Sequence, residues 1–249
     1  ITNKNAKKYL SATYTTSSAF NNYDKTRFRT YNSMLLNARN KYFGWQLNFG
    51  QNYRENALWN SFLKTDNNVF LSNTSTDRIN RSQFLKSGIT IDINKDRLLL
   101  NYDVFTSNGD SEIEGFGEGF SSLDKGKSLS TRQDFVVTYQ KRFDDKSKKL
   151  DFVLNYNKNK NDFNLFSKLF SVDLLNNFSN QDFYTAKIDY SQGLKILDDG
   201  KLSFGGLYDK LIFDTKSFGT TNLEYNRITT AGYIEFQAKL KKFDFILGT

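Results

Sequence analysis

Apolar and polar residues alternate along many short stretches of the chain. Residues 98–105, 150–157 and 202–209 show this pattern clearly. Successive side chains of a β-strand point to opposite faces, so the pattern predicts strands with one apolar face and one polar face. A polar face on nearly every strand is unusual for a sandwich core. It is typical of a transmembrane barrel, which has lipid outside and a wet lumen inside.

The alternation and the turn signals between the stretches predict about eleven strands. We expect them at Tyr9–Thr16, Arg27–Ala38, Tyr42–Tyr53, Leu85–Ile93, Arg97–Thr106, Arg132–Arg142, Lys149–Asn157, Asp182–Leu194, Lys201–Asp214, Arg227–Leu240 and Phe243–Thr249.

The connections between these strands alternate between short turns and long polar segments. The long segments, which we expect to be loops, are Arg54–Phe84, Ser107–Thr131, Lys158–Gln181 and Thr215–Asn226. Bacterial outer-membrane barrels have this rhythm, with short periplasmic turns and long extracellular loops. No linker or shift in composition divides the chain, so residues 1–249 are expected to form a single domain.

Charged residues fall on the polar side of the predicted strands, as a membrane barrel requires. Ile89, Ile91 and Ile93 share one side of their strand, while Asp92 is on the other. A charge on the lipid face costs about 2–4 kcal/mol at the midplane, so Asp, Glu and Lys should point into the lumen. Three apolar residues fall on the lumen side and need a cover there: Leu99, Phe105 and Val153.

Aromatic residues are also placed as a membrane barrel would place them. Six lie on the apolar side and are candidates for rings at the lipid–water boundary: Trp45, Tyr102, Tyr139, Tyr156, Tyr190 and Tyr208. The alternative is the ordinary preference of aromatic residues for strands. With 24 Phe and 14 Tyr, the chain is also too aromatic for a disordered segment.

Composition removes several classes of function. The chain has no His and no Cys, and therefore lacks the commonest general base, metal ligand and thiolate nucleophile. The net charge of +8 comes from dispersed Lys and Arg, which favours solvated turns or contact with anionic lipid head groups over nucleic-acid binding. No apolar run is long enough for a transmembrane helix.

No motif predicts catalysis or a bound cofactor. The segment Gly115–Gly119 resembles a phosphate loop but has no strand and helix around it, so we expect a flexible loop. Glu112, Glu114 and Glu118 could ligate a hard cation such as Ca²⁺, although their spacing fits no EF-hand. The paired carboxylates, Asp144-Asp145 and Asp198-Asp199, belong to predicted turns. We therefore expect no catalytic, cofactor or metal site, and the substrate-binding residues are unknown.

Several segments resemble the barrel of TonB-dependent outer-membrane receptors, in particular the outer-membrane β-barrel proteins of Bacteroidetes. Residues 1–7 (ITNKNAK) are similar to the end of a plug domain leading into the first strand. Residues 186–208, with KIDY and then DGKLSFGGLY, resemble a strand–turn–strand unit of the family, and residues 225–233 and 243–249 resemble later strands.

The resemblance implies an all-β, antiparallel transmembrane barrel of the meander type and energised uptake of a large nutrient such as a siderophore, glycan or peptide. The implied partners are a plug domain, the TonB complex acting through it, the lipid of the cell outer membrane and, as a further candidate, a surface lipoprotein. A plug inside the lumen would cover Leu99, Phe105 and Val153.

The chain departs from this family in what it contains. It lacks a signal peptide, a plug and a TonB box, and residues 1–8 would be the end of a plug or linker. About eleven strands is half of the about 22 expected of such transporters, and an open half-barrel is not viable in lipid. We therefore expect a fragment. The alternatives are a stand-alone barrel, acting as a passive channel or a structural protein, and a soluble β-rich binding protein of the cell surface.

Overall fold

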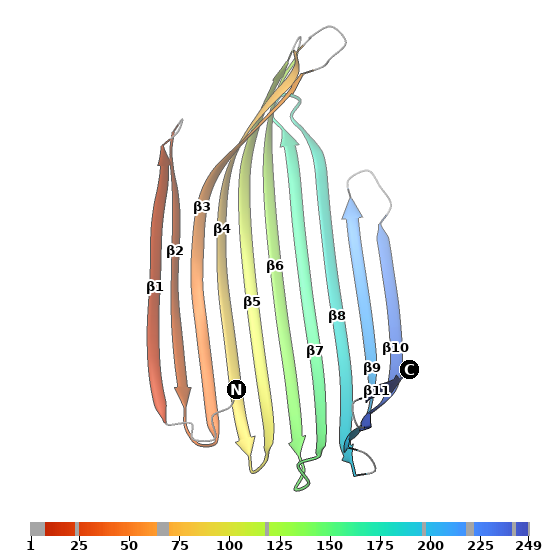
Figure 1. Cartoon of the computed structure of the whole chain (residues 1–249). Coiled ribbons are helices and arrows are strands. Elements are labelled where there is room, and N and C mark those ends of the chain that lie inside the picture. The colour runs from red at the N-terminus through yellow and green to blue at the C-terminus, as the bar shows by residue number, and fades with distance from the viewer. Residues whose placement is uncertain are drawn as a thin grey trace.

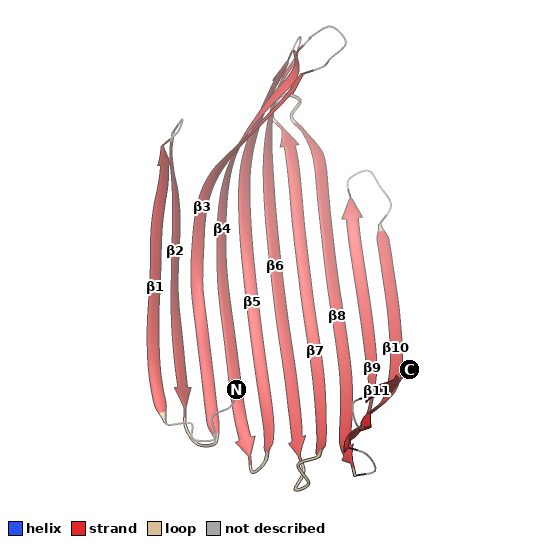
Figure 2. Ribbon diagram, viewed as in Figure 1, coloured by secondary structure: helices blue, strands red, loops and turns tan. Residues whose placement is uncertain are grey.

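The chain forms one antiparallel sheet in which every strand pairs with the next strand along the sequence (Figures 1 and 2). This computed structural model describes residues 8–22, 25–63, 70–117, 120–195, 198–217, 222–240 and 243–248. The strands are β1 (Tyr9–Asn22), β2 (Thr26–Arg39), β3 (Phe43–Leu63), β4 (Phe70–Ile93), β5 (Asp96–Gly117), β6 (Phe120–Arg142), β7 (Lys148–Ser167), β8 (Val172–Leu194), β9 (Asp198–Ser217), β10 (Leu223–Leu240) and β11 (Phe243–Gly248). No helix among the described residues could cross a membrane.

All eleven predicted strands are confirmed, but the prediction of long loops is wrong. Most of Arg54–Phe84 continues β3 and β4 as a paired hairpin, and Ser107–Thr131 does the same for β5 and β6. Most of Lys158–Gln181 belongs to β7 and β8, and Thr215–Asn226 contributes the ends of β9 and β10. In Figure 1 the hairpins of β3–β8 rise above those of β1–β2 and β9–β10.

The extensions were missed because their strand pairing does not depend on an alternating apolar face. Thr74 pairs with Gly115, and Asn161 pairs with Ser130 and Ser179. Once a strand leaves lipid, both of its faces can meet water. Polar side chains can then occupy both faces of the strand. Backbone hydrogen bonds continue the ladder without the periodic signal that a half-buried strand shows.

The short turns are held by local hydrogen bonds. The side-chain oxygen of Asn40 accepts from the backbone N–H groups of Tyr42 and Phe43, at 2.9 and 2.7 Å. Asn94 has a φ of 57°, a left-handed conformation that Asn tolerates better than most residues, in the tight turn between β4 and β5. These turns fix the register of the strands that they join.

The register places the apolar residues of neighbouring strands side by side on one face, which we call the outward face. Leu100 of β5 lies opposite Ile89 and Val137, and Leu154 of β7 lies opposite Val137 and Ala186. On β7 the apolar outward positions are bounded by Lys148 and Lys158. On β7, the apolar part of the outward face therefore has a lower and an upper limit.

A row of rings marks the upper limit of this apolar belt. Tyr102, Phe135, Tyr156 and Tyr184 lie directly opposite one another on β5, β6, β7 and β8. Rings of this kind favour the boundary between acyl chains and head groups. Of the predicted belt residues, Tyr102 and Tyr156 are in this row. Tyr139 and Tyr190 lie near the short turns instead, and Tyr190 packs against Phe204 with ring centroids 4.9 Å apart.

The sheet buries little of its apolar surface against itself. Among the described residues, Ala238 is the only buried hydrophobic side chain, while Leu154, Ile188 and Phe204 on the outward face are each more than 40% exposed. A water-soluble protein would hide such a continuous apolar face in a core. The exposed belt is what a sheet needs when lipid is its apolar solvent.

Candidate functional site

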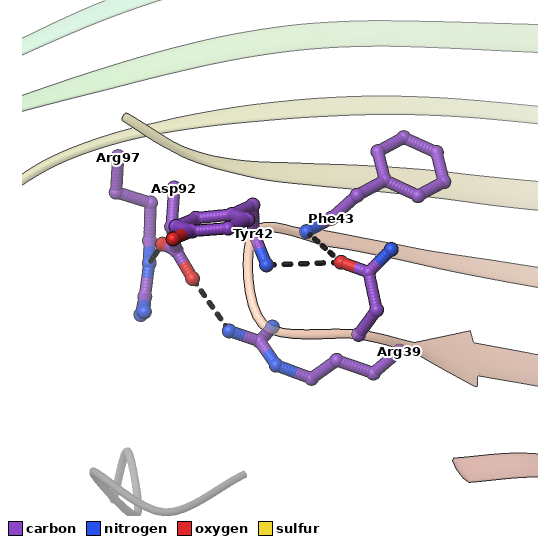
Figure 3. A network of polar contacts seen from close by, with 6 residues as sticks. Arg39, Tyr42, Phe43, Asp92 and Arg97 are labelled. Carbon is purple, nitrogen blue, oxygen red and sulfur yellow. Dashed lines mark hydrogen bonds and ion pairs between the residues drawn. The ribbon is translucent and has the colours of Figure 1, made fainter. Parts of the chain in front are cut away.

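The polar, inward face carries an ion-pair network near the short turns (Figure 3). Arg39 of β2 donates to Asp92 of β4 at 2.6 Å, and Arg97 of β5 donates to the other carboxylate oxygen at 2.6 Å. Asp92 is therefore held by two guanidinium groups, and its side chain is only 19% exposed. The inward placement predicted for Asp92 is confirmed, and its charge is compensated there.

A ring cluster interrupts the inward polar face farther along the strands. Tyr31 stacks on Phe84 with ring centroids 6.3 Å apart, and Phe105 lies opposite Phe84 on β5. Gly50 makes room for the cluster, because a Cβ there would come within 2.8 Å of the Phe84 ring. These three rings line a hollow of about 530 Å³.

Charged residues surround this ring cluster. Arg132 donates to Asp134 at 2.6 Å, and Lys86 lies 3.9 Å from Asp103. Lys86 and Asp103 are both more than 40% exposed, so this pair is weak and either side chain can contact another molecule. The hollow combines flat apolar rings with charges of both signs, which suits an amphipathic partner.

The three apolar residues predicted on the lumen side do lie on the inward face, but in two places. Leu99 and Val153 flank Thr138 near the short turns, whereas Phe105 joins Phe84 and Tyr31. Sequence reasoning missed Phe84 and Tyr31. Phe84 could have been found, because the adjacent pair Phe84-Leu85 breaks the alternation and places a large ring on the polar side.

A second hollow, of about 550 Å³, lies where the β1–β2 hairpin meets the extended hairpins. Arg27, only 6% exposed, donates to Asp77 of β4 at 2.8 Å, and Lys25 pairs with the other oxygen of that carboxylate. The backbone N–H of Phe28 donates to Glu55 of β3 at 2.9 Å. These contacts connect the β1–β2 turn and the start of β2 to β3 and β4. The backbone ladder between β2 and β3 begins only at Arg29.

The charges of this upper hollow shift the pKa values of its carboxyl groups. Partial burial opposes ionisation of Asp77, but its hydrogen bonds with Arg27 and Lys25 outweigh that effect and lower the pKa. Lys168 holds the pKa of Glu112 below its usual value through a 2.7 Å ion pair, and Glu112 in turn raises the pKa of Lys168. The hollow is therefore strongly ionised at neutral pH.

The predicted flexible loop at Gly115–Gly119 is wrong in part, since residues 115–117 end β5 as paired strand. Glu112 and Glu114 lie on that strand, and Glu118 falls outside the described residues, so the three-carboxylate hypothesis is not tested. Across the described parts of the chain, no group of three acidic side chains is gathered as a metal site. Asp145 accepts hydrogen bonds from the backbone and hydroxyl of Ser147, as a turn residue does.

Comparison with known proteins agrees with this architecture. Residues 141–249 match the model of the outer membrane protein beta-barrel family. No curated protein matches the chain. The fold is similar to the ferric yersiniabactin uptake receptor FyuA from Yersinia pestis, with a TM-score of 0.54, 11% identity, and coverage of 94% of this chain and 40% of that one.

Two further solved structures give the same result. The alcaligin outer-membrane receptor FauA from Bordetella pertussis has a TM-score of 0.59 at 10% identity, with 94% of this chain and 36% of that chain covered. The ferric preacinetobactin receptor BauA from Acinetobacter baumannii has a TM-score of 0.53 at 10% identity, with 94% and 44% covered.

The chain thus spans about two fifths of the length of these receptors. At such low identity the likeness concerns the fold, and that fold is the barrel wall predicted by the sequence resemblance. The chain is an all-β outer-membrane protein whose residues 141–249 match the outer membrane protein beta-barrel family and whose sheet is similar to the barrels of TonB-dependent receptors.

Proposed function

We propose that this chain forms part of the barrel wall of a TonB-dependent receptor that imports a large solute across the outer membrane. The observation that carries the proposal is the two-faced sheet itself. An apolar belt bounded by polar residues fits lipid on one side, and a charged face with an isolated ring cluster fits a filled lumen on the other. The siderophore receptors that share the fold support the same function.

The inward face supports a plug domain as the partner inside the lumen. A simple water-filled pore gains nothing from exposing Phe105, Tyr31 and Phe84 to water, whereas a domain packed against them would bury their rings. The adjacent exposed pair Lys86–Asp103 would give the same domain polar contacts that can open and close. TonB would act on the lumen contents through that plug.

The extended hairpins are the proposed surface for capturing the solute outside the cell. They place paired strands, rather than long loops, above the membrane belt on β3–β8. A stiff wall of this kind holds side chains more firmly than a loop does, so its charged hollow would keep its shape. A surface lipoprotein could dock at the same level.

The barrel would be completed by strands paired to the edges of β1 and β11, because unpaired edges are not viable in lipid. A stand-alone barrel that acts as a passive channel or a structural protein is the alternative. It would conduct small solutes without energy, and its ring cluster would line an open pore.

Uptake measurements separate these possibilities. A deletion strain and a complemented strain would be compared for uptake of ferric siderophores, oligosaccharides and peptides, with and without a protonophore. We expect one solute class to bind in both energy states and to enter only energised, complemented cells. Uptake that is insensitive to the protonophore, together with conductance by the purified protein in planar bilayers, would refute the receptor function.

A further inference from the structure

Three arginines gather on the inward face where the extended hairpin of β3 and β4 rises above the ring cluster. Arg29 is the next inward position after Tyr31 on β2, and it lies directly opposite Arg54 of β3. Arg78 of β4 lies opposite Asn56, which is the next inward position after Arg54. All three arginine side chains are exposed. We call Arg29, Arg54 and Arg78 the arginine group.

A single neutral oxygen accepts hydrogen bonds from two of these guanidinium groups. Nη2 of Arg29 and Nε of Arg54 both donate to Oδ1 of Asn56, at 3.3 and 2.6 Å. Like charges directly opposite each other on neighbouring strands destabilise a sheet, and a neutral amide oxygen does not cancel them. Because a guanidinium has several N–H donors, one bond from each group leaves most of the donors available to another molecule.

No carboxylate of the inward face compensates the arginine group. Above the ring cluster, the other described inward positions of β1–β5 hold amides, hydroxyls, glycines and apolar residues, with Arg27 as the one further charge. Arg27 is paired with Asp77. Within the described residues, no carboxylate oxygen lies within 4 Å of a nitrogen of the three guanidinium groups.

The outward rows of β2–β5 beside the arginine group hold four carboxylates, and each has a partner of its own. These pairs are Asp77 with Arg27 and Lys25, Glu55 with the backbone N–H of Phe28, Asp110 with Arg81, and Glu112 with Lys168. The carboxylates are therefore engaged on the other face of the sheet, and the arginine group presents an uncompensated positive charge to the lumen.

We propose that the arginine group is an anion-binding site that receives a carboxylate or phosphate group of the imported solute. Guanidinium groups bind such anions through paired hydrogen bonds, which suits donors that lie side by side on neighbouring strands. Tyr31, next to Arg29, stacks on Phe84 and offers flat rings to the apolar part of the same solute. This inference rests on the proposed function and narrows its solute to one that carries negative charge.

Calorimetric titration of the purified full-length protein in detergent tests the site, with inorganic pyrophosphate as the probe. We expect saturable binding at low salt, and R29Q/R54Q should weaken it at least about tenfold because charged hydrogen bonds are lost. The matched variant R81Q/R227Q removes two exposed arginines, one from the outward face of β4 and one from β10, and should leave the affinity unchanged. Absence of pyrophosphate binding, or an equal loss in the two variants, would overturn the proposal.

Stability measurements separate a binding site from a structural one. Removing two like charges that face each other should not lower the urea concentration at which the full-length protein unfolds in lipid vesicles. Added pyrophosphate should stabilise the unmodified protein but not R29Q/R54Q, since a ligand stabilises only the state that binds it. A lower unfolding midpoint for R29Q/R54Q without pyrophosphate would show that a carboxylate elsewhere in the protein pairs with these arginines, which would overturn the proposal.

Failure of the site can be told apart from failure of the proposed function. Pyrophosphate binding requires neither energy nor transport, so uptake that is insensitive to a protonophore would refute the receptor function without removing the anion site. In energised cells, R29Q/R54Q should lower uptake of the solute that the uptake measurements identify, and the remaining uptake should stay sensitive to the protonophore. A solute without an anionic group, or uptake that R29Q/R54Q leaves unchanged, would overturn this inference and leave the receptor function standing.

Discussion

Arg39 and Asp92 are joined by a 2.6 Å ion pair although their strands, β2 and β4, are separated by β3. Gly44 of β3 makes this possible, because a Cβ there would lie 3.3 Å from a guanidinium nitrogen of Arg39. A residue without a side chain thus opens the path along which Arg39 crosses its neighbouring strand. The pair joins β2 to β4 across β3 near the short turns, and Arg97 adds β5 to the network (Figure 3).

Replacing Asp92 with Asn should destabilise the sheet because two guanidinium groups would lose their shared anion. We expect the free energy of unfolding of the full-length protein to fall by about 2 kcal/mol, measured by guanidinium titration in lipid vesicles. The matched change D103N affects an exposed pair 3.9 Å apart on the same face and should cost less than about 1 kcal/mol. Equal effects of the two changes would contradict the structural role of the network.

Gly50 offers a test of the ring cluster. A Cβ at this position would lie 2.5 Å from the carbonyl oxygen of Asn32 and 2.8 Å from the Phe84 ring, so G50A must displace both β2 and the ring. We expect a loss of about 1–3 kcal/mol in the free energy of unfolding, which is typical of overpacking. The same substitution at Gly206, where the nearest atom is 3.7 Å away, should leave stability within about 1 kcal/mol. A comparable loss at both glycines would show that crowding of the added Cβ against the Phe84 ring is not the cause of the loss.

Different physical signals explain which parts of the structure the sequence predicted. Ile89, Ile91 and Ile93 meet lipid on one side only, and that one-sided burial gives the alternation from which their strand was predicted. Extended pairs such as Thr74–Gly115 meet water on both sides and leave no such signal, so they were expected to be loops. The polar signals between the alternating stretches located the short turns, and Asn40 and Asn94 stabilise two of them in the structure.

In the candidate site, too, some residues gave a signal in the sequence and others did not. Phe105 was found because it breaks the alternation within a predicted strand. The pairing of Arg27 with Asp77 joins residues 50 positions apart and depends on how the β1–β2 turn meets the extended hairpins. Periodicity describes neighbours on one strand, and it carries no information about such contacts.

Acid should loosen the upper hollow. Asp77 and Glu112 have lowered pKa values in the folded protein, so they stabilise it fully above the pKa values of the unfolded carboxyls, about 3.9 and 4.3. That stabilisation is lost as the pH falls through the lower, folded values. Spin labels on S18C and S75C should therefore show a narrow distance distribution at pH 7 and a broader one near pH 3. The variant D77N should broaden the distribution at pH 7 already, and a distribution unchanged by pH and by D77N would exclude this electrostatic connection.

Opposite faces of one strand should respond differently to a new charge. Leu154 is on the outward face of β7, between Val137 and Ala186, and its neighbour Asn155 points inward. L154R would place a guanidinium near the middle of the belt and should cost about 2–4 kcal/mol, whereas N155R would meet the wet lumen and should cost less than about 1 kcal/mol. The yield of heat-modifiable, SDS-resistant protein after folding into vesicles measures the difference. A larger penalty for N155R than for L154R would reverse the assignment of the two faces, and with it the direction in which the ring cluster of Tyr31, Phe84 and Phe105 points.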